Sequence, residues 1–138
     1  GVMMRKKLLV IIIFIFWVVG GLTTVGLSED VPSITKDELK AMLGNPDLEI
    51  LDVRLGSDYF SSDLKIKGAD RPTDTYFGAV QISYYSKDKT IIFYCASPHE
   101  SMSASIVERF TKYGFTKVYV LKGGWEEWLK AQYPTEKK

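Results

Sequence analysis

The single cysteine of the chain, Cys95, is the residue best placed to act as a nucleophile. It directly follows residues 90–94, a β-branched and aromatic run that is apolar on both faces, as a central parallel strand requires. Open α/β sheets bind their ligands at the carboxyl ends of such strands. The free amides and dipole of a helix predicted after Cys95 would stabilise an anion, so we expect a lowered thiol pKa and reaction as the thiolate. A small core residue is the other interpretation of a cysteine at this place, and both stay open.

The loop after Cys95 carries two side chains that could interact electrostatically with a bound anion or take part in proton transfer. As a cation, His99 could assist the thiolate or accept a proton, whereas at a loop tip it would simply be solvated. Glu100 either opposes an anionic ligand or serves as an acid in the first turn of the helix, where it complements the dipole. Hydroxyl groups in the same segment either bind an anion or cap the helix; they belong to Ser97, Ser101 and Ser103.

Helices and short apolar strands alternate along the chain and place Cys95 at the edge of a sheet. Thr35 followed three residues later by Glu38 is a capping-box pattern, which predicts the start of a helix. Apolar residues at spacings of three and four predict a helix over residues 100–113, which Gly114 ends. Strands are expected at 48–53, 90–94 and 118–121, a last helix at 125–131, and in the aperiodic segment 54–89 a helical turn near 57–60 and a strand around 79–82. This alternation predicts a parallel sheet covered on both faces.

Composition excludes two classes of protein. The 138-residue chain has 18 basic and 17 acidic residues, and three of the basic residues precede the first acid, Glu29. The formal net charge of +1 therefore becomes −2 for residues 29–138, with 15 basic against 17 acidic residues. A strongly basic surface is excluded, so no nucleic-acid partner is expected. One cysteine cannot form a disulfide scaffold, and one Cys with one His at this spacing builds no metal site, so we expect no metal or other cofactor.

Residues 1–28 have the pattern of a signal peptide or transmembrane anchor, and residues 29–138 form the folded domain. The basic residues at 5–7 precede residues 8–27, which carry no charge and are long enough to cross a hydrocarbon core of about 30 Å. Small residues at Gly26 and Ser28 fit a signal-peptidase site, so cleavage and anchoring both remain open. Either alternative exports the domain, which we expect in the periplasm or anchored on the extracytoplasmic side of the membrane.

Five short motifs resemble those of a rhodanese-like domain in their order and spacing. Each motif is weak alone, but five in the same order make a specific match that covers nearly all of residues 33–134. The motifs are Leu51-Asp52-Val53-Arg54, Ile66-Lys67-Gly68-Ala69, Ile91-Ile92-Phe93-Tyr94-Cys95, Gly114-Phe115-Thr116-Lys117-Val118-Tyr119 and Leu121-Lys122-Gly123-Gly124-Trp125-Glu126-Glu127-Trp128.

The resemblance implies an α/β rhodanese-like fold, a five-stranded parallel sheet with helices on both faces, preceded by the hydrophobic segment. It implies that Cys95 carries sulfane sulfur as a persulfide between a donor and an acceptor. Asp52 and Arg54 match the family's Asp-x-Arg, which supports the active-site face. The backbone that lines the substrate pocket would come from Ala96, Ser97, Pro98, His99, Glu100 and Ser101.

The loop departs from the commonest pattern of the resembled family. Both usual arginines are absent, because Ala96 and Glu100 occupy their positions. Pro98 stands where the family has a glycine, which removes an amide donor and stiffens the loop. The pattern Cys-x-x-Pro-x-Glu resembles a subtype of membrane-associated rhodanese-like proteins, in agreement with the hydrophobic segment 1–28.

The function implied is a rhodanese-type sulfurtransferase, in which Cys95 passes sulfur from a small-molecule donor to a thiol, a protein thiol or cyanide. A carboxylate at Glu100 opposes a negative charge at 4 Å by about 4 kcal/mol at an effective dielectric of about 20. We therefore expect a persulfide donor to serve better than the dianion thiosulfate. The alternative is a non-catalytic rhodanese-fold module that binds a partner or senses sulfur or redox state, which the missing arginines keep open.

Overall fold

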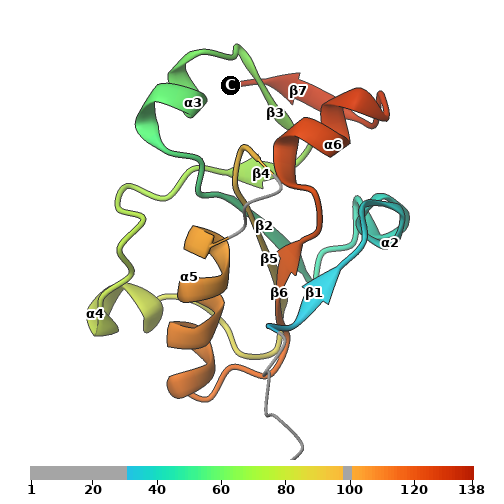
Figure 1. Ribbon diagram of the computed structural model, residues 1–138. Helices are drawn as coiled ribbons and strands as arrows, with labels where there is room; N and C mark the ends of the chain where they lie inside the picture. The colour runs from blue at the N-terminus through green and yellow to red at the C-terminus, as the bar shows by residue number, and fades with distance from the viewer. Residues whose placement is uncertain (1–30, 98–100) are drawn as a thin grey trace, which may run out of the picture.

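Five parallel strands form the centre of the structure, a computed structural model that describes residues 31–97 and 101–138 (Figure 1). The strands are β1 (Ser33–Ile34), β2 (Leu48–Asp52), β4 (Ala69–Asp70), β5 (Thr90–Tyr94) and β6 (Val118–Leu121). The helices are α2 (Lys36–Met42), α3 (Gly56–Phe60), α4 (Ala79–Ile82), α5 (Ser101–Lys112) and α6 (Gly124–Lys130). Two further strands, β3 (Leu64–Ile66) and β7 (Thr135–Lys137), form a separate antiparallel pair.

The strand order in the main sheet is β1-β6-β5-β2-β4, with every pair parallel, which confirms the predicted five-stranded parallel sheet. β5 occupies the middle and pairs with β2 on one side and β6 on the other. Four of its five residues, 91–94, are completely buried, which explains why the strand is apolar on both faces. Cys95 therefore leaves the sheet at the carboxyl end of its most buried strand.

Helices cover both faces of the sheet, as predicted (Figure 1). Alternate residues of β5 point to opposite faces, so Ile91, Phe93 and Cys95 pack on the side of α5. Ile92 and Tyr94 pack on the other side, against residues of α2 and α6. Cys95 thus belongs to the apolar core beneath α5.

The strand expected around residues 79–82 is wrong, because these residues form the single-turn helix α4. The apolar composition of Ala79–Ile82 suggested a strand, but only Ile82 is buried, and Val80 is 71% exposed. The amide of Ile82 donates to the carbonyl of Gly78, and that of Ser83 donates to Ala79, as in a helical turn. A single helical turn can bury one side chain without the alternation of buried and exposed residues that a strand needs. Tertiary packing therefore outweighed the β propensity of the local sequence.

The predicted cap of the first helix is confirmed. The capping hydrogen bond at the start of α2 forms between the Glu38 amide and the Thr35 hydroxyl, at 3.2 Å. In the last helix Trp125 and Trp128 are buried, whereas Leu129 is 46% exposed. The pair β3–β7 was not predicted, because strands of three residues give no measurable alternation.

The predicted signal peptide or anchor, residues 1–28, lies outside the described residues. In the part of the chain that the structure describes, every helix is too short or too polar to span a membrane.

Candidate active site around Cys95

The sulfur of Cys95 contacts the hydroxyl of Ser103, with 2.7 Å between Sγ and Oγ. Cys95 is 9% exposed at the end of β5, and Ser103 is fully buried in the first turn of α5. When Cys95 is a thiolate, the hydroxyl must be the donor in this contact. Ser103 therefore contacts the Cys95 sulfur directly, an arrangement that differs from both the anion binding and the helix capping considered from the sequence.

The first turn of α6 holds the loop that follows Cys95. The amide of Trp125 donates to the carbonyl of Cys95 at 2.8 Å, and the amide of Glu126 donates to the carbonyl of Ala96 at 3.0 Å. All described peptide bonds are trans, so the N–H that follows each carbonyl points the opposite way. The amides of Ala96 and Ser97 are consequently directed away from α6, an arrangement that can present them to an anion.

Gly124 makes this contact between α6 and the loop sterically feasible. Its φ of +57° lies in the left-handed region, and a Cβ on it would lie 2.6 Å from the carbonyl oxygen of Cys95. The same Cβ would lie 3.1 Å from the carbonyl oxygen of Ser97. A side chain at position 124 would therefore push the loop off the helix. In the sequence Gly124 stood out only as part of the fifth rhodanese-like motif, which gives no sign of this contact.

Asp52 and Arg54 form a completely buried ion pair beneath the loop, with 2.6 Å between Arg54 Nη2 and Asp52 Oδ2. Burial by itself lowers the pKa of Arg54, but the hydrogen bond and charge of Asp52 outweigh it and raise the pKa. The hydroxyl of Tyr94 donates to the same carboxylate at 2.8 Å. Burial first, and then the charge of Asp52, raise the pKa of Tyr94 far above its ordinary value, so it remains a neutral donor.

The buried pair supports α6 through Trp125. The guanidinium carbon of Arg54 lies 4.5 Å from the centre of the Trp125 ring. The ring of Tyr94 stacks on Trp125 with a centroid separation of 6.3 Å and an interplanar angle of 27°. Because the Trp125 amide holds the Cys95 carbonyl, Asp52 and Arg54 act on the loop through this ring. The structure thus links both residues to the loop that follows Cys95.

Arg71 is a cation at this edge of the sheet that sequence analysis missed. Its Nη1 donates to the carbonyl of Asp52 at 3.0 Å and to that of Arg54 at 2.5 Å. Its guanidinium lies 4.5 Å from the centre of the Tyr59 ring, and its side chain is 27% exposed. Arg71 lies in the aperiodic segment between two predicted strands, so no sequence pattern marked it.

The structure describes three of the six predicted pocket residues. Ala96 and Ser97 are half-buried beside α6, and Ser101 is exposed at the start of α5. The other three predicted pocket residues lie outside the described residues; they are Pro98, His99 and Glu100.

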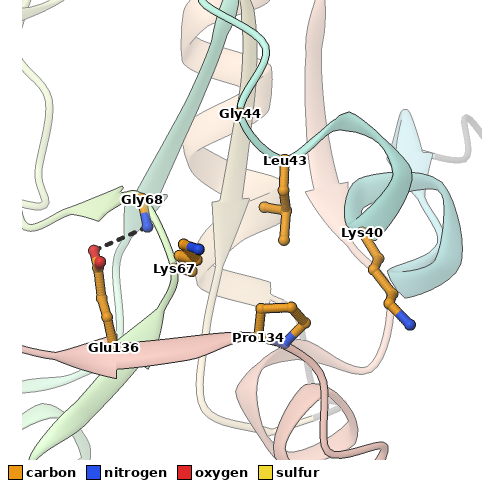
Figure 2. A pocket seen from close by; sticks show the side chains of 7 residues that line it. All are labelled: Lys40, Leu43, Gly44, Lys67, Gly68, Pro134 and Glu136. Atoms are coloured by element: carbon orange, nitrogen blue, oxygen red, sulfur yellow. Dashed lines mark hydrogen bonds between the residues drawn. The ribbon is translucent and has the colours of Figure 1, made fainter.

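A pocket of about 420 Å³ lies away from the Cys95 loop (Figure 2). Its lining comes from the end of α2, the turn between β3 and β4, and the start of β7. Glu136 accepts a hydrogen bond from the amide of Gly68 at 2.9 Å across it. None of the residues that line it belongs to the Cys95 loop, so it is separate from the candidate active site.

A parallel α/β sheet whose middle strand is followed by a buried cysteine, with the next loop anchored on a helix N-terminus, defines a class of α/β proteins with a cysteine at the carboxyl edge of the sheet. Within that class, the chain belongs to the Rhodanese-like domain family, whose model matches residues 35–131. This finding confirms the resemblance seen in the sequence at the level of the family.

Relatives and solved structures agree with this assignment. Thiosulfate sulfurtransferase GlpE of Glaesserella parasuis serovar 5 (strain SH0165) is 27% identical over 110 residues, which cover 80% of this chain and 97% of that protein. The rhodanese-like domain of the Anabaena sp. Alr3790 protein is 31% identical with a TM-score of 0.63, covering 78% of this chain and 80% of that one. The BH2092 protein of Bacillus halodurans is 25% identical with a TM-score of 0.66, covering 78% and 77%.

We predict that Gly124→Ala loosens the loop from α6. The variant should lose about 2 kcal/mol or more in free energy of unfolding, because strain at positive φ adds to the clash with the Cys95 carbonyl. Its Cys95 should react more slowly with iodoacetamide at neutral pH, because displaced amides no longer stabilise the thiolate.

Gly44→Ala is the matched control for this prediction. Gly44 also has a positive φ, +86°, but a Cβ there meets nothing within 4 Å. It should lose about 1 kcal/mol and leave the alkylation rate of Cys95 unchanged. Equal alkylation rates in both variants would show that α6 does not position the loop.

We also predict that Arg54→Met lowers the free energy of unfolding in urea by about 3–5 kcal/mol, because the buried carboxylate of Asp52 then keeps only the more distant Arg71, at 3.9 Å, as a cation. The control is Lys65→Met, which breaks the partly exposed 3.5 Å pair with Glu136. The control should cost no more than about 1 kcal/mol. Similar losses in the two variants would contradict the proposed support by the buried pair.

Proposed function

We propose that the protein is a sulfurtransferase that carries sulfane sulfur as a persulfide on Cys95. The observation that carries the proposal is the environment of the Cys95 sulfur. The buried hydroxyl of Ser103 lies 2.7 Å from Sγ, and the carbonyls of Cys95 and Ala96 accept hydrogen bonds from the first turn of α6. A hydroxyl donor and amides directed away from α6 both favour negative charge on sulfur. The family assignment and the sulfurtransferase name of the Glaesserella relative support the same activity.

The transfer takes place in two displacement steps. In the first step the Cys95 thiolate attacks the outer sulfur of a donor, and the rest of the donor leaves as sulfite or as a thiolate. In the second step an acceptor thiolate attacks the outer sulfur of the Cys95 persulfide, and Cys95 leaves as the thiolate. Ser103 donates to the Cys95 sulfur whenever that atom carries charge, at the start and at the end of the cycle.

A persulfide is the donor that this chain favours over thiosulfate. The segment from Cys95 to Ser101 contains no arginine or lysine and has an acid at Glu100. A dianion entering such a loop meets repulsion of about 4 kcal/mol per charge at 4 Å and an effective dielectric of about 20. A thiol persulfide carries less charge and meets less repulsion.

The second candidate function is a binding or sensing module in which Cys95 takes up sulfur or becomes oxidised without turnover. The observation that favours it is the replacement of both usual loop arginines, by Ala96 and Glu100. An acceptor assay separates the two functions, because a sensing module keeps its sulfur when a thiol acceptor is added.

We further propose that residues 1–28 attach the protein to a membrane or direct its export, with the domain on the extracytoplasmic side. The basic residues at 5–7 followed by the uncharged residues 8–27 support this location. The partners would then be a small-molecule sulfur donor and a thiol or protein thiol outside the cytoplasm, in accordance with the membrane-associated subtype suggested by the Cys-x-x-Pro-x-Glu pattern.

We predict that a low-molecular-weight persulfide adds one sulfur atom, about 32 Da, to the intact protein, and that the adduct is absent from Cys95→Ser. Thiosulfate at the same concentration should give a smaller yield. The adduct should disappear when cyanide or a thiol is added. Mass spectrometry of the intact protein measures all three quantities. If neither donor gives an adduct, sulfur transfer is refuted. If an adduct forms but remains after cyanide or a thiol is added, the sensing module is favoured.

We predict that the full chain, expressed in a Gram-negative bacterium, is digested when protease is added to spheroplasts with an intact inner membrane. A cytoplasmic enzyme serves as the control and must stay protected. Retention of the intact 15.6 kDa mass in the membrane fraction would identify an anchor, and a shorter soluble product would identify a cleaved signal. Protection of the domain until the cells are lysed would contradict the proposed location.

A further inference from the structure

The connections that lead into β5 and β6 lie at the edge of the sheet opposite to Cys95. Because β2, β5 and β6 are parallel neighbours, their amino ends share one edge. The connections 83–89 and 113–117 contact each other there, since Nζ of Lys117 donates to the carbonyl of Asp88 at 3.4 Å. The exposed residues of these two connections therefore form one surface, which we call the amino-edge surface.

The described part of the chain enters the fold at this same edge. β1 pairs with β6 so that Ser33 lies level with Val120, and the amide of Val120 donates to the carbonyl of Pro32 at 2.9 Å. Continuing this register by two residues places Val31 level with Val118, the first residue of β6. Figure 1 shows the blue start of β1 at the lower end of the sheet, where the yellow and orange connections into β5 and β6 also lie.

The segment before Val31 limits how far this edge can lie from a membrane. Residues 8–27 are uncharged, and twenty residues of helix cover about 30 Å, the thickness of a hydrocarbon core. The four steps from residue 27 to Val31, which include the acids Glu29 and Asp30, cover at most about 14 Å. Headgroups fill about 5–7 Å of this distance. An anchor at residues 8–27 therefore holds the amino edge close to the headgroups.

The side chains of the amino-edge surface suit a layer of phospholipid headgroups. Tyr84 is 81% exposed and Tyr113 is 49% exposed, and tyrosine is enriched where membrane and water meet. Lysine side chains can bury their apolar stems at such an interface and place the ammonium group among phosphates. The connections 83–89 and 113–117 hold three lysines and one acid: Lys87, Lys89, Lys117 and Asp88. They are thus more positive than residues 29–138 as a whole, whose net charge is −2.

The carboxyl edge of the sheet lies on the far side from this surface. The five residues of β5 separate the two edges by about 17 Å. Cys95 follows β5, and the amide of Trp125 donates to its carbonyl, so the loop and the start of α6 lie at the carboxyl edge. A domain that rests on its amino edge therefore turns Cys95 away from the membrane.

We propose that the amino-edge surface rests on the phospholipid headgroups of the membrane in which residues 8–27 are anchored. Lys87 and Lys117 pair with headgroup phosphates, and Tyr113 contacts the interface beside them. Cys95 then faces the aqueous phase, so its sulfur donor and acceptor reach it from water and not from the lipid. The proposal rests on the membrane attachment proposed above and is independent of sulfur transfer.

The test measures the distance of labelled positions from the headgroups. Single cysteines are introduced into the full chain carrying Cys95→Ser and are labelled with a fluorophore. Ser86→Cys and Thr116→Cys report on the amino-edge surface, and Ser57→Cys, at an exposed serine of α3 beyond the carboxyl end of β2, is the matched control. The proteins are reconstituted in vesicles of phosphatidylcholine and phosphatidylglycerol that contain a lipid with a spin-labelled headgroup. Quenching at positions 86 and 116 should exceed that at position 57 roughly twofold or more, because the length of a strand, about 17 Å, separates them.

Charge reversal tests the role of the lysines. Lys87→Glu combined with Lys117→Glu should reduce the quenching at position 86 to roughly half, because the carboxylates are repelled by the headgroup phosphates. Lys122→Glu combined with Lys130→Glu makes the same change of charge at exposed positions outside the surface and should leave the quenching unchanged. Circular dichroism verifies that both pairs of substitutions keep the fold.

The outcomes separate this proposal from those on which it rests or that stand beside it. Equal quenching at all three positions, or quenching that charge reversal leaves unchanged, would overturn the contact with headgroups. Energy transfer between labels at position 86 of two copies, without quenching, would show a contact between copies and would also overturn it. If the full chain does not float with the vesicles, the anchor and this contact both fail. Sulfur loading of Cys95, measured separately by mass, is unaffected by any of these results.

Discussion

The hydrogen bonds from the first turn of α6 to the carbonyls of Cys95 and Ala96 are the constraint on which the site depends. They turn the loop carbonyls toward the helix and the following amides away from it, which prepares the loop for negative charge on sulfur. They require a glycine at position 124, because any Cβ there would collide with the Cys95 carbonyl. They also require a fixed Trp125, which stacks on the buried Arg54. A residue far from the sulfur in sequence therefore decides how the sulfur is presented.

The elements nearest to the nucleophile could be predicted from sequence because their signals are strong. β5 is apolar on both faces, and α5 has a regular apolar stripe. The four-residue helix α4 was taken for a strand, because a single turn gives no helical periodicity. The short pair β3–β7 gave no signal either, since its partners are about seventy positions apart in the chain. Local sequence patterns do not predict the pairing of short strands that are far apart in the chain.

The site itself was predicted only in part. The sequence and the family resemblance singled out Cys95, and the structure places it at the end of the central strand. The contact of Ser103 with the sulfur was not predicted, because the three serines of this segment were considered only as ligands of an anion or as helix caps. Arg71 escaped notice, because a cation that comes from another segment leaves no trace in the motif of the loop.

The central claim is that the fold stabilises the thiolate of Cys95, and the pH dependence of its alkylation tests this directly. Because the chain has one cysteine, the rate of reaction with iodoacetamide reports on that thiol alone. The rate is measured against pH for the folded protein and for the protein unfolded in urea. The account predicts that the folded protein reaches half of its maximal rate at a lower pH than the unfolded chain. A midpoint at the same or a higher pH would contradict it.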